Sequence, residues 1–256
     1  MVAPNPVAIS ILGIDVMWYG VLIGTGFILA IMISYYRAPK LGIDPEFILT
    51  LTIWIIPGAL IGARSYYVIF NWQSYAGDIG KILDVRSGGL AIHGGLILCF
   101  IIGYFLCKYY KEHFLDVADL VAPVIALAQS IGRWGNFFNE EAHGYATDLP
   151  WAQIINGVGY HPTFLYESIW CFLLFCFLMW FSYNKRAFSG QIICLYGMLY
   201  SVERFFVESF RTDSLMIGPL RQAQVISLVI IAVCAILYII LKRKNSNSNR
   251  QSKGDY

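Results

Sequence analysis

The feature that most constrains this 256-residue chain is a series of five long, almost entirely apolar stretches. A helix needs roughly 20 mostly apolar residues to cross the hydrocarbon core of a bilayer. Apolar residues make up 58% of the chain and charged residues only 13%, which is too few to cover a water-soluble domain. We therefore expect an all-α polytopic membrane protein, with its clearest spans at 18–36, 47–70, 90–110, 163–183 and 223–241.

Two further segments, 117–131 and 191–209, are less apolar because charged residues, among them Asp119, lie inside them. Both segments are bounded by polar loops, and both are needed to make the distribution of Lys and Arg consistent, so we count them as functional spans that tolerate polar residues. This predicts a single catalytic domain of seven transmembrane helices over residues 1–241. The remaining segment, 242–256, is basic and rich in Asn and Ser, and we expect it to be a disordered tail.

The Lys and Arg residues set the orientation of these seven spans, because cytoplasmic loops are enriched in both. The distribution predicts an external N-terminus and a cytoplasmic C-terminus. The side that holds the tail carries Arg37, Lys40, Lys108, Lys111, Lys185, Arg186, Lys242, Arg243, Lys244, Arg250 and Lys253, whereas the other side carries Lys81, Arg86, Arg133, Arg211 and Arg221.

The sixth predicted span carries a polar stripe near its external end. Tyr200, Arg204, Glu208 and Arg211 are spaced by four, four and three residues, so they share one helical face. Glu208 can pair with either arginine, which lowers the cost of charge at membrane depth. For Glu208 a purely structural ion-pair ladder is as good an interpretation as a direct role.

Arginines, and no lysines, occupy the positions nearest to the external ends where polar residues converge: Arg64, Arg133, Arg204 and Arg211. A guanidinium group binds phosphate through two parallel hydrogen bonds, which an ammonium group cannot do. The pattern therefore indicates an anionic, phosphate-bearing ligand, and in the outer leaflet this ligand would be a phospholipid headgroup. Each arginine alone could instead snorkel to the interface or neutralise a glutamate, and we favour that interpretation for Arg64.

His93 lies at the start of the third span, within the sequence GGLAIHGGL (88–96). The flanking glycines, including Gly94 and Gly95, allow a backbone or a lipid to approach closely. A neutral imidazole is a suitable general base for a thiol. The alternative is a histidine that forms a hydrogen bond between helices.

The segment GRWGNFFNEEAHG (132–144) is dense in polar residues at a membrane boundary. We expect Asn136 and Asn139 to bind headgroup or backbone groups, Glu141 to orient an arginine, and Gly144 to close a turn. A polar external loop is the simpler interpretation, but it does not explain why glycines alternate with aromatic residues.

This segment resembles the signature of the bacterial prolipoprotein diacylglyceryl transferases. Supporting segments are WYG (18–20), AIHGGL (91–96), HPTFLYE (161–167) and YSVERFFVESFR (200–211), so the resemblance runs from about Trp18 to Arg211. The positions that match the signature are Gly132, Arg133, Gly135, Asn136, Phe137, Asn139, Glu141 and Gly144.

The resemblance implies a seven-span enzyme of the bacterial cytoplasmic membrane with its active site toward the outer leaflet. Such an enzyme moves the diacylglyceryl group of phosphatidylglycerol to the lipobox cysteine of a prolipoprotein signal peptide and releases glycerol 1-phosphate. The resemblance implies catalytic roles for His93, Arg133 and Arg204. Residues expected to bind substrate are Tyr19, Arg64, Gly94, Gly95, Asn136, Asn139, Glu141, Gly144, Tyr200, Glu208 and Arg211.

Two other functions fit part of the pattern. A transporter for an anionic substrate would need polar residues near the midplane or on both sides, but the cytoplasmic halves of the spans are nearly featureless. A lipid-binding receptor would have no use for a glycine-flanked histidine. We expect no metal and no cofactor, because no His, Asp or Glu set has ligand spacing, and no nucleic-acid partner.

Overall fold

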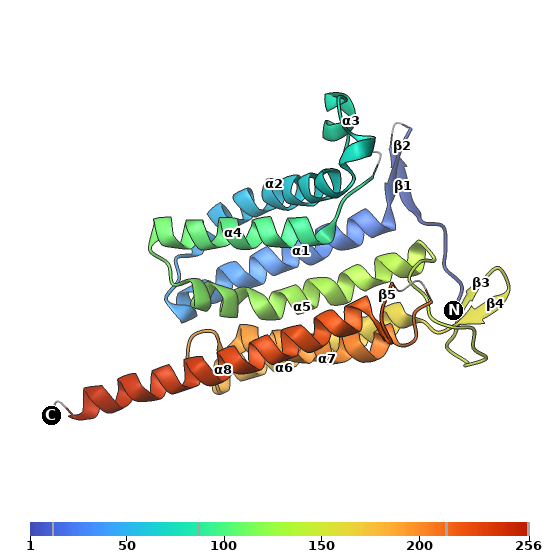
Figure 1. The fold of residues 1–256 in the computed structure, drawn as a ribbon. Coiled ribbons are helices and arrows are strands. Elements are labelled where there is room, and N and C mark those ends of the chain that lie inside the picture. The colour runs from blue at the N-terminus through green and yellow to red at the C-terminus, as the bar shows by residue number, and fades with distance from the viewer. Residues whose placement is uncertain (12, 86–87, 213–214, 255–256) are drawn as a thin grey trace. The chain divides into compact units, whose positions relative to one another are not determined.

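The computed structural model describes all residues except 12, 86–87, 213–214 and 255–256, and side chains as far as residue 247. All seven segments predicted as spans are helical (Figure 1). They are α1 (Trp18–Arg37), α2 (Pro45–Phe70), α4 (Ile92–Tyr110), α5 (Phe114–Phe138), α6 (Thr163–Asn184), α7 (Gln191–Glu208) and α8 (Gln222–Gly254).

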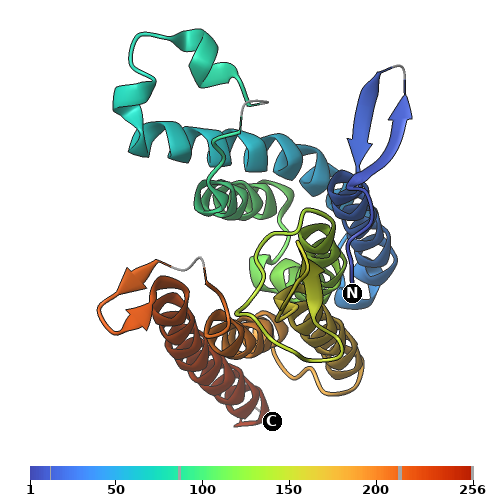
Figure 2. The same cartoon turned by 90° about the vertical axis from the view of Figure 1, so that its right-hand side faces the viewer.

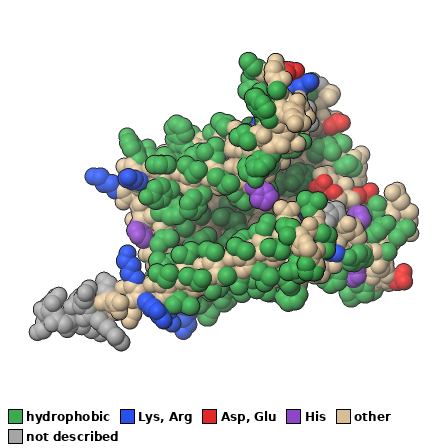
Figure 3. All heavy atoms as spheres, viewed as in Figure 1, with side chains coloured by type: hydrophobic (Ala, Val, Ile, Leu, Met, Phe, Trp, Pro, Cys, Tyr) green, Lys and Arg blue, Asp and Glu red, His purple; other side chains and the backbone are tan. Residues whose placement is uncertain are grey.

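Six of these helices, all except α7, are long and apolar enough to cross a membrane. Their outer surfaces carry many exposed apolar side chains, and Figure 3 shows hydrophobic groups over most of the visible helix surface. Such a surface requires lipid around it. The chain is therefore a multi-pass membrane protein, and the charged residues of α7 explain why this helix is less apolar than the others.

Two helices are longer than the sequence predicts. Helix α5 continues to Phe138, so Arg133 and Asn136 lie on its last turns instead of in the loop after it. Helix α8 extends through Gly254 and so covers most of the tail that the sequence predicts to be disordered.

Short elements connect the helices. Hairpins form from β1 (Val7–Ile11) and β2 (Ile14–Met17), from β3 (Gln153–Ile155) and β4 (Val158–Tyr160), and from β5 (Met216–Ile217) and β6 (Leu220–Arg221). The β3–β4 turn is Asn156-Gly157, and both residues have positive φ (51° and 81°), which is the conformation that Asn-Gly favours. The remaining elements are the short helix α3 (Ile79–Leu83) and the 3₁₀ turns η1 (Ala38–Leu41) and η2 (Trp72–Ser74).

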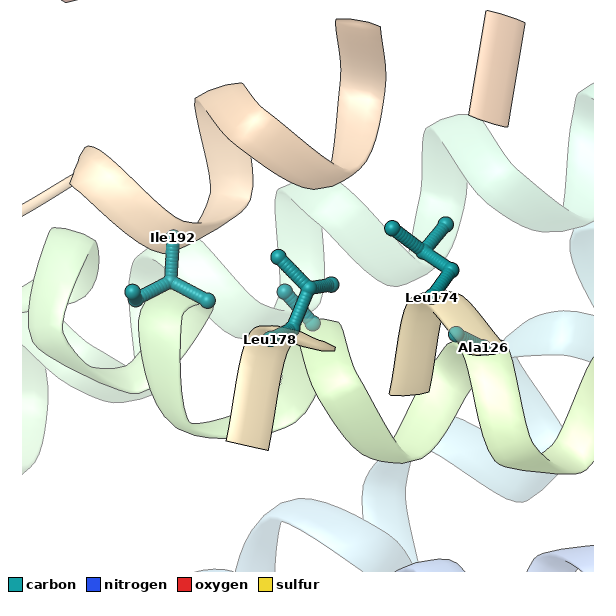
Figure 4. Packing of buried hydrophobic residues seen from close by; sticks show 5 residues of the cluster. Ala126, Leu174, Leu178 and Ile192 are labelled. Carbon is teal, nitrogen blue, oxygen red and sulfur yellow. The ribbon is translucent and has the colours of Figure 1, made fainter. Parts of the chain in front are cut away.

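The chain divides into two compact units, residues 1–33 with 118–256 and residues 34–117, and each is described by itself. In the larger unit, α5, α6 and α7 pack around a buried apolar cluster (Figure 4), and Figure 2 looks along these helices. The cluster comprises Ala122, Ala126, Leu174, Leu178 and Ile192.

Asp119 fixes the start of α7. Its carboxylate is fully buried and accepts hydrogen bonds from the backbone N–H groups of Gly190 and Ile193, both at 2.9 Å. It also pairs with Arg186 Nε at 2.9 Å. A carboxylate at a helix N-terminus satisfies N–H groups that the helix leaves free and is stabilised by the helix dipole. Asp119 therefore has a structural role, because it positions the start of α7, the helix that carries Arg204.

Candidate functional site

Two arginines from different helices of the larger unit bind one buried carboxylate. Arg133 Nε on α5 lies 3.0 Å from Glu167 Oε2, and Arg204 Nη1 on α7 lies 2.6 Å from Glu167 Oε1. The Glu167 side chain on α6 is 2% exposed, whereas those of Arg133 and Arg204 are 22% and 19% exposed. Glu167 therefore fixes both guanidinium groups from the buried side and leaves part of each accessible.

Close contact between α5 and α6 sets this geometry. Ser130 Oγ donates to the Ser168 carbonyl at 2.8 Å, and Ser168 Oγ donates to the Ser130 carbonyl at 2.9 Å. Trp134 Nε1 also donates to Ser168 Oγ at 3.0 Å. Small hydroxyl residues let helix backbones approach closely in a membrane. Because Ser168 follows Glu167 directly, this contact positions the carboxylate opposite Arg133.

Of the four residues predicted to share one face of the helix, Tyr200, Arg204 and Glu208 lie on α7, whereas Arg211 lies beyond its end, in an isolated β-bridge. Arg204 Nη2 lies 2.5 Å from Glu208 Oε2, so the predicted i,i+4 pair forms. Tyr200 hydrogen-bonds Arg133 and stacks on Tyr196 with ring centroids 5.7 Å apart. Tyr196 in turn donates to Gln129 Oε1 at 2.9 Å. The face of α7 that carries Arg204 thus looks toward α5 and α6.

The polar segment after α5 is organised by Glu141. Its Oε1 accepts hydrogen bonds from the side-chain amides of Asn136 (2.9 Å) and Asn139 (3.4 Å), and its backbone N–H donates to the Asn136 carbonyl. We predicted that Glu141 orients an arginine. The contacts of its carboxylate that the structure describes are instead with the two amides.

Gly144 lies where three segments meet. Its N–H donates to the His161 carbonyl at 2.9 Å, and it pairs with Arg211 in an isolated β-bridge. A Cβ atom at this position would lie 2.7 Å from the His161 Cβ and 3.0 Å from the Phe210 carbonyl oxygen. Gly144 thus lies in a β-bridge and not in the predicted turn, and close packing explains why glycine is required there.

Tyr19 lies in the first turn of α1 against the last turns of α5. A Cβ atom at Gly135 would lie 2.0 Å from the Tyr19 ring, so only glycine leaves room for this ring. Trp18 stacks on Phe138 beside it, with ring centroids 5.3 Å apart. Tyr19 itself is 40% exposed, so its side chain is accessible to a ligand.

Arg221, which the sequence analysis does not select, holds the end of α7. Its guanidinium donates to the Glu208 carbonyl and to the Tyr145 hydroxyl. It joins the segment after α7 to the loop that follows Gly144. Glu167 is also absent from the predicted site, although it is the one acidic residue in the apolar stretch 163–183, and this isolation signals a buried partner.

In the smaller unit, Arg64 is bound by backbone carbonyl groups. Its Nε donates to Ile82 (2.9 Å), its Nη1 to Gly88 (2.7 Å) and Gly89 (3.0 Å), and its Nη2 to Lys81 (2.5 Å). The residue is 6% exposed. These contacts differ from headgroup binding, from snorkelling and from the neutralisation of a glutamate. They indicate that Arg64 binds the backbone shortly before His93.

His93 lies in the first turn of α4 and is exposed. Gly94 packs against α2 so closely that a Cβ atom would lie 2.2 Å from the Gly62 carbonyl oxygen, and one at Gly95 would lie 3.0 Å from the Ala59 carbonyl oxygen. In this structure the two glycines contact the neighbouring helix, which positions the histidine beside them. Their predicted role in binding substrate stays a prediction.

A depression of about 450 Å³ also lies in the larger unit, between the N-terminal segment and the end of α5. Asn139 and Glu140 line it, together with residues 3–6, Met17 and Phe138. The arginine pair is not part of its lining, so we base the functional assignment on the arginines.

Comparison with known proteins identifies the family. The family model for prolipoprotein diacylglyceryl transferase matches residues 6–240, which include both arginines and Glu167. The chain belongs to this family. A phosphatidylglycerol–prolipoprotein diacylglyceryl transferase of Clostridioides difficile (strain 630) is 51% identical over 242 residues, which cover 94% of this chain and 97% of that protein.

Two further members of the prolipoprotein diacylglyceryl transferase family carry the same name and match over nearly their whole length. The protein from Finegoldia magna is 49% identical over 245 residues, covering 96% of this chain and 99% of the relative. The protein from Clostridium novyi (strain NT) is 47% identical over 257 residues, covering 96% and 100%. The resemblance seen in the motifs is thus confirmed at the level of the whole chain.

Proposed function

We propose that this protein transfers the sn-1,2-diacylglyceryl group of phosphatidylglycerol to the thiol of the lipobox cysteine in prolipoproteins. This is the first step of bacterial lipoprotein maturation. The observation that carries the proposal is the pair Arg133 and Arg204 on the two oxygens of Glu167. Family membership and the names of the relatives support the same reaction.

The reaction replaces a carbon–oxygen bond with a carbon–sulfur bond. The thiolate attacks C3 of the diacylglyceryl glycerol, a thioether forms, and the bond from that carbon to the phosphate oxygen breaks. Glycerol 1-phosphate leaves with the bonding electron pair, so negative charge increases on its phosphate oxygens. Donors fixed at that position before the reaction stabilise the transition state more than the bound lipid.

Arg133 and Arg204 are suited to this role because Glu167 restricts their motion. A guanidinium that is already oriented loses less conformational freedom when it binds phosphate. The side chains keep about one-fifth of their surface exposed, so a headgroup can reach them. Tyr200, which contacts Arg133, can supply a further donor to the same phosphate.

The thiol proton requires an acceptor, and we propose His93. A neutral imidazole matches the acidity of a thiol, and the His93 side chain is exposed at the start of α4. The signal peptide that carries the cysteine is the second substrate. The reaction balances because the proton that the thiol loses is released and the phosphate product leaves with one more negative charge than the phosphodiester had.

We further propose that α7 crosses the bilayer with the other six helices, which gives seven spans. The excess of Lys and Arg near the end of α8 supports a cytoplasmic C-terminus and an external N-terminus. In this orientation the arginine pair lies toward the outer leaflet of the cytoplasmic membrane.

The experiment that tests the function uses purified protein, phosphatidylglycerol vesicles and a synthetic lipobox peptide, with mass spectrometry as the readout. We expect a diacylglyceryl mass increase on the peptide cysteine. The increase should be lost in Arg133→Ala and in a peptide whose cysteine is replaced by serine. No mass increase with correctly folded wild-type protein would overturn the proposal.

A further inference from the structure

Glu203 is a buried acid that the mechanism above does not use. The residue is 5% exposed, and neither carboxyl oxygen has a hydrogen-bond partner among the described residues. It precedes Arg204 on α7, but the contacts of Arg204 are with Glu167 and Glu208. A buried polar group without a partner is uncommon in a folded protein and calls for an explanation.

The charged groups around Glu203 belong to the arginine site. Glu203 interacts electrostatically with Glu167, Arg133 and Arg204. It also interacts with the buried thiol of Cys171 on α6. Two titratable groups of α8, which packs along α7, have described contacts with α7. These are Cys234, beside Gly197, and Tyr238, bonded to Gln191.

The charge balance of this cluster depends on Glu203. Two arginines are matched by the two carboxylates that contact them, Glu167 and Glu208, so these four groups are neutral together. An ionised Glu203 would add one negative charge with no hydrogen bond to offset its desolvation. Burial of such an unpaired charge costs several kcal/mol, so the neutral carboxylic acid is the favoured form.

We propose that Glu203 is held as a neutral carboxylic acid and thereby sets the charge of the arginine site for an anionic headgroup. The inference rests on the proposed function for the identity of the ligand. With Glu203 neutral, Glu167 and Glu208 balance the charges of the two arginines, and the site has no excess negative charge when a phosphodiester binds. With Glu203 ionised, the same headgroup meets a site that is already negative, in a low dielectric where repulsion is strong.

The protonation state can be measured without any substrate. Infrared spectra of the purified protein in lipid nanodiscs at neutral pH should contain a protonated carboxylic acid band that disappears in Glu203→Gln. The matched control is Glu141→Gln, an exposed acid, which should remove intensity only from the ionised carboxylate bands. If Glu203→Gln also removes only ionised carboxylate intensity, the proposal is overturned.

The effect on the ligand is tested by the KM for phosphatidylglycerol across the alkaline range. If the lipid binds only the neutral form, the wild-type KM rises by about tenfold per pH unit once Glu203 ionises. In Glu203→Gln the neutral form is permanent, so its KM should not show this rise, whereas kcat keeps the wild-type pH profile. Parallel KM profiles for the two proteins would overturn the proposed role.

Failure of the proposed function gives a different result from failure of this inference. If wild-type protein transfers no diacylglyceryl group at any pH, the function is wrong, but the infrared comparison still decides the state of Glu203. If transfer occurs and the protonated band is absent, the function stands and the inference about Glu203 is wrong.

Discussion

At the scale of single residues, Glu167 is the centre of the proposed site because it contacts both arginines. The sequence predicts Arg133 and Arg204 from residue type and spacing, but it does not predict the carboxylate that joins them. Glu167 lies on α6 and Arg204 is 37 residues further along the chain. Only the packing of α5, α6 and α7 brings these three side chains together, and a local sequence pattern does not predict that packing.

Replacing Glu167 with glutamine tests this role. An amide offers one acceptor and presents an N–H group to the other guanidinium, so one arginine loses its partner. We expect kcat/KM to fall by on the order of 100-fold and the free energy of unfolding to fall by about 3–5 kcal/mol. The control is Asp148→Asn, an exposed acid of the same unit that belongs to no part of the proposed site. Activity in Glu167→Gln close to wild type would contradict the positioning role.

Arg64 gives a second residue-scale prediction. Lysine keeps the charge but cannot donate to four carbonyl groups at once, so Arg64→Lys should release the carbonyl groups of Lys81, Ile82, Gly88 and Gly89. We expect faster backbone hydrogen exchange at residues 79–85 and 88–91 and unchanged exchange in α6. Equal exchange rates in variant and wild type would show that these four bonds do not hold the segment.

At the scale of elements, the length of the apolar runs predicts where helices occur, but it does not predict where they end. Long apolar runs predict five of these helices, and α5 and α7 are predicted from less apolar segments that hold charged residues. Helix α5 continues to Phe138 because its polar last turn packs on Tyr19 and on Glu141. The three hairpins are missed because their strands are only two to five residues long. Among these hairpins, only Asn-Gly at 156–157 is a clear sequence signal for a hairpin turn.

The contact between α2 and α4 gives an element-scale prediction. Gly94→Ala would place a methyl group 2.2 Å from the Gly62 carbonyl oxygen, so the helices must separate. We expect a loss of about 1–3 kcal/mol in stability. Gly24→Ala is the matched control, because a Cβ atom at Gly24 meets nothing within 4 Å. Thermal unfolding in nanodiscs measures both, and equal melting temperatures would contradict the close contact.

At the scale of the whole molecule, the seven-span topology depends on whether α7 crosses the bilayer. The ionisable residues Glu203, Arg204 and Glu208 make this helix less apolar than the six that meet the length and hydropathy expected of a span. Pairing of Arg204 with Glu167 and Glu208 inside the protein reduces the cost of inserting these charges. The proposed orientation therefore requires Lys185 and Met216, at the two ends of α7, to lie on opposite sides of the membrane.

Single cysteines at these two positions test the topology. The side chains of Lys185 and Met216 are both exposed. The six native cysteines all lie within helices, and labelling of the protein without added cysteines gives the baseline. In spheroplasts, a membrane-impermeant maleimide should label Met216→Cys directly and Lys185→Cys only after permeabilisation. Labelling of both from the same side would contradict a crossing by α7.

The most direct test of the central claim is the rate of diacylglyceryl transfer by Arg133→Lys and Arg204→Lys. Lysine keeps the charge but loses the planar pair of donors, so the account predicts that each variant loses transfer activity by on the order of 100-fold or more. Arg243→Lys in the basic part of α8 should retain wild-type activity. Near-normal transfer by both Arg133→Lys and Arg204→Lys would contradict the assignment of the phosphate to this arginine pair.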